Sequence, residues 1–163
     1  MRDDNAVARE KAALRARMLD RLRTMSSDER TARSEMICAR VVDSVVWKDS
    51  RAVVLFAPLR TEPQIASLEA AAVAEGKSTF IIPQRLRVEA ELQLPFAPDL
   101  ILVPGLAFSA SGHRLGRGGG IYDRLLGGRG AAAHKLAICF AFQRFETIPI
   151  ELHDVVMNAI ISD

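Results

Sequence analysis

The residues best suited to chemistry lie in a glycine-rich stretch that runs from Arg114 to Asp123 and reads RLGRGGGIYD. Residues 112–135 around it carry five basic side chains but a single acidic one. Glycines let backbone N–H groups turn inward around an anion, and each arginine can hold a phosphate group with paired donors. A helix that begins near Ile121 would add its positive end. The stretch therefore predicts a phosphate-binding loop, and a flexible surface loop is the alternative interpretation.

The glycine-rich stretch matches neither of the two common nucleotide-binding motifs. It contains no Gly-Lys followed by Ser or Thr at the spacing of a P-loop. It also does not lie directly between a predicted strand and a helix, as a dinucleotide-binding fingerprint does.

Two basic residues near the N-terminus are candidates for the same anion. On a helical wheel Lys11 falls between Leu14 and Leu22, inside the apolar stripe of the first predicted helix, and Arg15 flanks that stripe. A cation on a buried face needs either a route to solvent along its own stem or a buried anion. The pair is therefore either a snorkelling lysine beside a solvated arginine, or two cations aimed at a phosphate chain.

Three carboxylates are candidates for binding substrate or metal. Glu62 follows the first predicted strand, where it can bind donors on a substrate or complement the positive end of the next helix. Asp123 and Asp154 can together hold Mg²⁺, which often takes one or two protein carboxylates plus substrate phosphates. The alternative is that Asp123 belongs to the first turn of a helix and Asp154 to an ordinary turn.

The histidines and cysteines point to no metal site and no covalent nucleophile. His113, His134 and His153 lack the spacing of metal ligands. Cys38 falls in a helical pattern and Cys139 in a strand pattern, which is typical of packed thiols.

Composition bounds the class of protein. A chain of 163 residues predicts one domain over residues 1–163, and 49% hydrophobic with 26% charged residues excludes disorder as the main state. There is no apolar run of ~18 residues and no signal peptide, since the N-terminus is too charged. With two cysteines and a net charge of +2, we expect a cytoplasmic protein without nucleic-acid or membrane partners, and a monomer or weak homodimer.

Strands and helices must alternate to position these residues. The first 50 residues predict two helices, the second starting at Ser26 with a capping box to Glu29 and running towards Trp47. Continuous apolar runs predict strands, and helical spacing predicts two further helices; the strands are 52–57, 78–82, 99–103, 135–141 and 155–161, and the helices 63–75 and 122–126. This alternation predicts an α/β fold with a mostly parallel sheet covered on both faces, and ligands at the carboxyl ends of its strands.

These blocks resemble, in order, the 5-formyltetrahydrofolate cyclo-ligases (methenyltetrahydrofolate synthetases). The specific block is DLILVPGLAFS (99–109) followed by GHRLGRGGGIYDRLL (112–126). Lys11-AAL-Arg15, FAPLRTEP (56–63), and Phe142-Gln143 followed by IPIELHD (148–154) are similar to the family's other blocks.

The resemblance implies a three-layer α/β/α sandwich and conversion of 5-formyltetrahydrofolate to 5,10-methenyltetrahydrofolate with ATP and Mg²⁺. It implies catalytic roles for Lys11, Arg114 and Tyr122, and Mg²⁺ ligands at Asp123 and Asp154. The implied ATP-binding residues are Lys11, Arg15, Arg114, Leu115, Gly116, Arg117, Gly118, Gly119, Gly120, Ile121 and Tyr122. The implied folate-binding residues are Ala57, Glu62, Arg117, Gly118, Gly119 and Gly120.

The chain departs from the family pattern at two places. Ile121 stands where the family usually has a first tyrosine, and the interval 84–98 is shorter than in typical members, which carry extra elements of the folate pocket there. A shortened paralogue can act as a nucleotide- or phosphate-binding module, or use another substrate. A phosphosugar isomerase on a related fold, with Glu62 as its base, is a third hypothesis.

Overall fold

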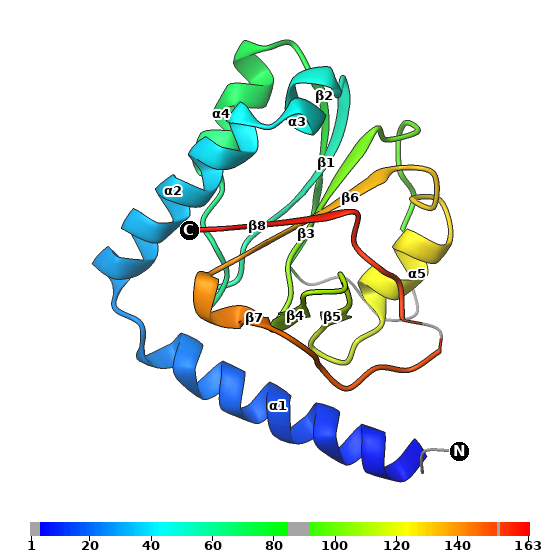
Figure 1. The fold of residues 1–163 in the computed structure, drawn as a ribbon. Coiled ribbons are helices and arrows are strands. Elements are labelled where there is room, and N and C mark those ends of the chain that lie inside the picture. The colour runs from blue at the N-terminus through cyan, green and yellow to red at the C-terminus, as the bar shows by residue number, and fades with distance from the viewer. Residues whose placement is uncertain (1–3, 85–91, 153) are drawn as a thin grey trace.

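The computed structural model describes residues 4–84, 92–152 and 154–163 (Figure 1). His153 and residues 85–91 of the short interval 84–98 lie outside the described residues. No helix in the described ranges is both long enough and apolar enough to cross a bilayer.

Helices occupy the first 50 residues, as predicted. They are α1 (Asp4–Thr24), α2 (Ser27–Asp43) and α3 (Val45–Asp49). The Ser26 hydroxyl accepts the Glu29 N–H at 3.1 Å, which confirms the predicted start of the second helix. The prediction that this helix continues towards Trp47 is wrong, because the extended backbone of Ser44 ends α2 and its side chain caps α3.

A five-stranded parallel sheet forms the centre of the molecule. Its strands, in spatial order, are β2 (Ser78–Ile82), β1 (Ala52–Phe56), β3 (Leu100–Val103), β6 (His134–Cys139) and β8 (Ala159–Ser162). All four pairings are parallel, as the continuous apolar runs predict. Helix α4 (Ala66–Ala74) connects β1 to β2, and α5 (Ile121–Gly127) lies between β3 and β6 in the chain.

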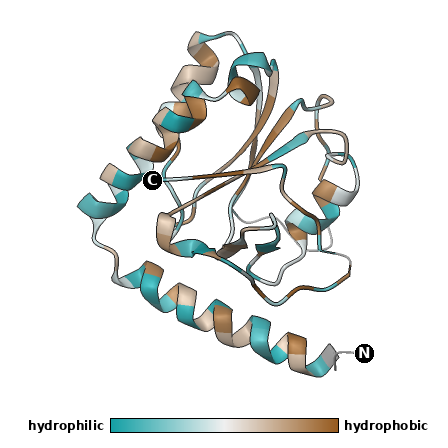
Figure 2. Ribbon diagram, in the orientation of Figure 1, coloured by the Kyte–Doolittle hydropathy of each residue, from teal (hydrophilic) through white to brown (hydrophobic). Residues whose placement is uncertain are grey.

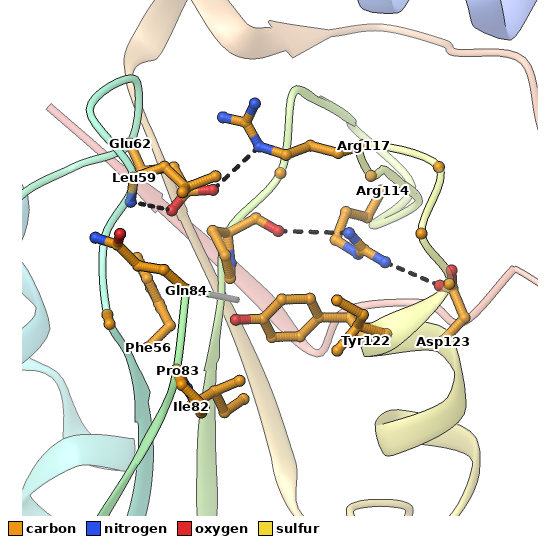
Figure 3. A pocket seen from close by; sticks show the side chains of 18 residues that line it. Phe56, Leu59, Glu62, Ile82, Pro83, Gln84, Arg114, Arg117, Tyr122 and Asp123 are labelled. Atoms are coloured by element: carbon orange, nitrogen blue, oxygen red, sulfur yellow. Dashed lines mark hydrogen bonds and ion pairs between the residues drawn. The ribbon is translucent and has the colours of Figure 1, made fainter. Parts of the chain in front are cut away.

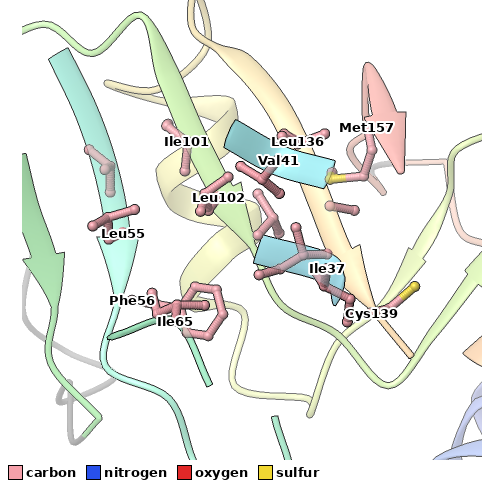
Figure 4. Packing of buried hydrophobic residues seen from close by; sticks show 14 of the residues in the cluster. Ile37, Val41, Leu55, Phe56, Ile65, Ile101, Leu102, Leu136, Cys139 and Met157 are labelled. Atoms are coloured by element: carbon pink, nitrogen blue, oxygen red, sulfur yellow. The ribbon is translucent and has the colours of Figure 1, made fainter. Parts of the chain in front are cut away.

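Helices cover both faces of this sheet, which gives the three-layer arrangement. Figure 4 shows Ile37 and Val41 of α2 packed on one side of the strands, while α5 lies on the other side. Successive side chains of β3 point to opposite faces of the sheet. Leu102 therefore packs with α2, while Ile101 lies against the turn after α5 near Gly130. Strands β1 and β3 are hydrophobic along their whole length, whereas hydrophilic and hydrophobic residues are mixed along α1 (Figure 2).

A second, three-stranded sheet was not predicted from the sequence. It consists of β5 (Arg114–Leu115), β4 (Ala107–Ser109) and β7 (Arg144–Phe145), and a 3₁₀ helix, η1 (Ala141–Gln143), leads into β7. Helix α1 lies along this small sheet rather than on the central one (Figure 1). The guanidinium groups of Arg17 and Arg21 lie over the rings of Phe145 and Phe142, at 5.6 and 4.2 Å from the ring centres.

Candidate functional site

A pocket lies at the carboxyl ends of β1, β2 and β3, where the topology predicts a ligand site. Strand β1 connects to β2 on one side and pairs with β3 on the other, so the pocket stands at the point where the strand order reverses. It has about 160 Å³ of room for water-sized groups. Its lining comprises Phe56, Ala57, Leu59, Glu62, Ile82, Pro83, Gln84, Pro104, Gly105, Arg114, Gly116, Arg117, Gly118, Gly119, Gly120, Ile121, Tyr122 and Asp123 (Figure 3).

Arg114 is the buried cation of this pocket. Its side chain is 5% exposed, and its Nη2 donates to Asp123 Oδ1 at 2.9 Å. The guanidinium carbon lies 5.4 Å from the centre of the Tyr122 ring. Its Nε is buried without a hydrogen-bond partner among the described residues. Arg114 therefore sits in a fixed orientation with donor capacity to spare, which suits it to an anionic ligand.

Glu62 and Arg117 face each other across the mouth of the pocket. Arg117 Nε lies 3.3 Å from Glu62 Oε1, and Arg117 Nη2 donates to Thr61 Oγ1 at 2.6 Å. The other Glu62 oxygen accepts the Leu59 N–H at 2.9 Å (Figure 3). The Glu62 side chain is 8% exposed and the Arg117 side chain 33% exposed. Glu62 is therefore buried in the lining of the pocket, while Arg117 is the member of the pair that reaches solvent. The structure thus brings the predicted folate residue and a predicted phosphate residue together.

Tyr122 forms the floor between these charges. Figure 3 shows its hydroxyl pointing across the pocket towards the ends of β1 and β2. Loss of solvent, and then the negative charge of Glu62, raise the pKa of the Tyr122 phenol far above its ordinary value. The phenol is therefore a permanent hydrogen-bond donor at neutral pH and not a base.

The glycines of the loop provide backbone shapes and space that other residues would not. Gly118 and Gly120 have φ angles of +98° and +63°, in the left-handed region. Gly116 makes room for Arg114, because a Cβ on Gly116 would lie 2.5 Å from Arg114 Nη1. Helix α5 begins directly after Gly120, so the loop feeds into a short helix as predicted.

Helix α1 is attached to the loop through Arg15, whose Nε donates to the Gly116 carbonyl oxygen at 2.9 Å. Lys11, about one turn earlier in α1, is 5% exposed, and its Nζ lies 2.7 Å from both Glu151 Oε2 and Asp154 Oδ2. The snorkelling interpretation of Lys11 is therefore wrong, since its ammonium is buried between carboxylates. Lys11 is not among the described residues that line the pocket.

Sequence reasoning missed several residues of the site. Gln84 lies two residues after the end of β2, and its Nε2 donates to the Pro58 carbonyl oxygen at 2.6 Å. Its place at a strand end was the signal that could have identified it. Gln143 is buried and its Nε2 donates to the carbonyl oxygens of Gly105 and Leu106, which fixes the turn after β3. Glu151 pairs with Lys11 across 140 residues, and no local pattern signals that contact.

Comparison with known proteins shows which protein family this chain matches. The model of the 5-formyltetrahydrofolate cyclo-ligase family matches residues 7–97 and 81–163. The chain belongs to this family. Its fold is that of two solved methenyltetrahydrofolate synthetases: one from Mycoplasma pneumoniae (TM-score 0.80, 22% identity, 94% of this chain and 99% of that one) and one from Aquifex aeolicus (TM-score 0.78, 28% identity, 93% and 88%).

Two similar proteins have names that state the cyclo-ligase activity of this family. The 5-formyltetrahydrofolate cyclo-ligase of Mus musculus is 24% identical over 187 aligned residues, which cover 93% of this chain and 92% of that protein. The cyclo-ligase of Mycolicibacterium smegmatis is 45% identical over 64 residues, or 39% of this chain and 33% of that protein. This member of the cyclo-ligase family, a family of ATP-dependent ligases, is thus an enzyme.

Two of the comparisons bear on the length of this cyclo-ligase family member. The two matched pieces of the family model overlap at residues 81–97. The alignment with the mouse protein is longer, at 187 residues, than the 163 residues of this chain, so that relative contains residues that this chain lacks.

The carboxylates of the site suit a metal cation that takes most of its ligands from a bound substrate. No group of three or more His, Cys, Asp or Glu side chains among the described residues has the arrangement of a metal site. Asp123 lines the pocket with a side chain 39% exposed, while the Asp154 oxygen nearest Lys11 also accepts the Glu151 N–H at 2.8 Å. A Mg²⁺ ion that retains waters and binds phosphates needs only one or two carboxylates, so Asp123 fits this role, whereas Asp154 is not among the described residues that line the pocket.

Proposed function

We propose that the protein catalyses the ATP- and Mg²⁺-dependent conversion of 5-formyltetrahydrofolate to 5,10-methenyltetrahydrofolate. The observation that carries the proposal is the pocket at the strand ends, where a buried arginine and left-handed glycines lie opposite a buried carboxylate. Cations and free N–H groups suit a triphosphate, and a carboxylate suits the N–H donors of a pterin ring.

The chemistry explains why the site has no nucleophilic side chain. A formyl group on nitrogen is an amide, so its carbon is a poor electrophile and its oxygen a poor leaving group. Attack of that oxygen on the γ-phosphorus of ATP releases ADP and forms a phosphorylated iminium. The neighbouring amine, N10 of the folate, then adds to the carbon and loses its proton, and phosphate departs with the former formyl oxygen. This reaction requires positioning and charge neutralisation.

Each side chain has a corresponding task in this proposal. Arg114 and the N–H groups of residues 115–120 hold the transferring phosphoryl group, and Arg114 neutralises the charge that develops on it. Arg117 breaks its ion pair with Glu62 and binds the nucleotide or the folate instead, because the Arg117 side chain is the more exposed of the two. Tyr122 donates a hydrogen bond to the substrates, consistent with the raised pKa of its phenol.

Helix α1 forms the far wall of the nucleotide site. Arg15 already touches the loop at Gly116 and can reach a phosphate from there. Lys11 approaches from the same helix, and its carboxylate partners set the orientation of its ammonium. We assign Lys11, Arg114 and Tyr122 as the catalytic residues of the reaction.

Asp123 and Asp154 are the proposed carboxylates for Mg²⁺, and Asp123 fits better because it lines the pocket. When bound, Mg²⁺ would neutralise phosphate charge and orient the triphosphate. Ala57 and Glu62 are the proposed folate contacts from the end of β1, together with the shared loop residues 117–120.

The proposal is tested by the near-ultraviolet absorbance of the methenyl product, using purified protein with ATP, Mg²⁺ and 5-formyltetrahydrofolate. We expect a rise that depends on both ATP and Mg²⁺. Folded protein that is stabilised against heat by ATP but forms no product would contradict the proposal, and would favour a nucleotide-binding module. The short interval 84–98 is the feature that favours this second candidate.

The setting we propose for this enzyme is the cytoplasm, as a monomer or weak homodimer. The two cysteines, Cys38 and Cys139, are free and buried, as expected where thiols stay reduced.

A further inference from the structure

A second, wider pocket borders the turn that carries Glu62, since Thr61 and Gln64 line it. It has about 820 Å³ of room open to solvent. Its lining residues come from the end of α1, the start of α2 and the turn after β1; they are Arg23, Met25, Ser27, Arg30, Thr31, Arg60, Thr61 and Gln64. We call it the arginine pocket. Three of these residues are arginines, and none of the described lining residues is acidic.

Arg30 gives the arginine pocket a buried and incompletely paired cation. The residue is 9% exposed, and its Nη2 donates to the carbonyl oxygens of Leu22 and Met25 at 3.0 and 3.2 Å. Its Nη1 is buried and has no hydrogen-bond partner among the described residues. Buried polar groups are normally paired, so Arg30, which lines the pocket, has one donor left over, and a small turn of its guanidinium would bring that donor to an acceptor in the pocket.

No protein carboxylate in the described ranges supplies that acceptor. Burial and the charge of Arg60 both lower the pKa of Arg30, so the two guanidinium groups are close enough to repel each other. The charge of Glu29 partly offsets this lowering of the Arg30 pKa, but the Glu29 carboxylate is bound by Arg33 at 3.0 Å. An anion between Arg30 and Arg60 would relieve the repulsion and accept the unused donor.

The start of α2 adds to the same positive field. Ser27 lines the arginine pocket and is the first residue of this 17-residue helix, so the positive end of its dipole is at the pocket wall. Hydroxyl groups of Thr31 and Thr61 and the amide of Gln64 complete a lining that suits a carboxylate or a phosphate.

We infer that the arginine pocket binds a small anion with two or more carboxylate or phosphate groups, at a site distinct from the one at the strand ends. The inference does not depend on the proposed function. An anion there would contact the turn that positions the proposed substrate pocket, because Thr61 lines one pocket and also accepts from Arg117 of the other.

Amide chemical shifts of the full-length, isotope-labelled protein test this site, with inorganic pyrophosphate and citrate as separate probes. The readout separates the two pockets, because the arginine pocket alone reports through residues 27–31, whereas Glu62 and residues 116–120 of the glycine loop line the pocket at the strand ends. Arg60→Gln is the test variant, since Arg60 is exposed and no described contact depends on it. Arg129→Gln is the matched control, because it removes the same charge from an exposed position that lines neither pocket.

We expect saturable shifts at residues 27–31 and 60–64, with binding weakened about fivefold or more in Arg60→Gln and unchanged in Arg129→Gln, since one charge-assisted contact is lost. If only pyrophosphate causes shifts, the ligand is a phosphate; if only citrate does, the ligand is a carboxylate. Shifts with both probes would show that the site recognises either kind of anion. Shifts confined to the glycine loop, or equal weakening by the two substitutions, would overturn the inference.

Discussion

The contact between Lys11 and Asp154 yields the sharpest prediction about stability. The Lys11 side chain is 7% exposed and Asp154 11% exposed, with Nζ and Oδ2 at 2.7 Å. Removing one partner of a buried ion pair costs about 3–5 kcal/mol, because the other charge remains buried. Glu151 holds the same ammonium, and its side chain is 39% exposed, so it offsets part of this loss.

We therefore expect Asp154→Asn to lower the free energy of unfolding by about 2–3 kcal/mol. For a chain of this size that is a fall in Tm of roughly 4–12 °C. Urea denaturation gives the free energies, and calorimetry gives the Tm.

A double-mutant cycle separates the ion pair from unrelated packing effects. Lys11→Met removes the buried charge, so Asp154→Asn should cost at least about 1 kcal/mol less in that background than in the wild type. Glu29→Gln serves as an exposed control; it breaks a helical pair with Arg33 and should cost about 0.5 kcal/mol. A loss from Asp154→Asn that is equal in both backgrounds would refute the reasoning.

Three further predictions concern the pocket and the buried thiol. Arg114→Lys keeps the charge but loses the planar guanidinium, so kcat/KM in the product assay should fall about 100-fold; an unchanged value would remove Arg114 from the chemistry. Gly116→Ala puts a Cβ 2.5 Å from Arg114 Nη1 and should raise the KM for ATP, whereas Gly127→Ala, which meets open space, should not; equal KM values in the two variants would contradict this role of Gly116. Burial raises the pKa of the Cys139 thiol to about 12. Because the unfolded thiol ionises near ~8.5, the stability due to this group is fully present below that pH and is lost as the pH rises towards 12. Urea midpoints should therefore fall over this range, less steeply in Cys139→Ala, and identical slopes would contradict the assignment.

The central sheet could be predicted because its signal is local. Runs such as 52–57 and 100–103 are apolar at every position, as expected for strands buried on both faces, and they contain β1 and β3. The start of α2 was predictable for a similar reason, because Ser26 and Glu29 lie within one turn.

The small sheet could not be predicted, because β5 and β7 have two residues each and carry no periodicity. Arg114 therefore looked like a loop residue, although it lies in a buried strand.

The candidate site was predicted in its parts but not in its contacts. The position of Lys11 in an apolar stripe indicated burial, and the structure confirms that burial. Its partners Glu151 and Asp154 lie more than 100 residues away in the chain, so only the fold brings them together. The pairing of Arg117 with Glu62 depends in the same way on the fold, which brings the glycine-rich loop after β5 against the turn after β1.

The fate of the formyl oxygen tests the central claim most directly, namely that the pocket at the strand ends transfers a phosphoryl group to that oxygen. 5-Formyltetrahydrofolate with heavy oxygen in its formyl group would be turned over with ATP and Mg²⁺, and the inorganic phosphate analysed by mass spectrometry. The account predicts one heavy oxygen in each phosphate released. Unlabelled phosphate, with the heavy oxygen recovered in water or formate, would contradict it.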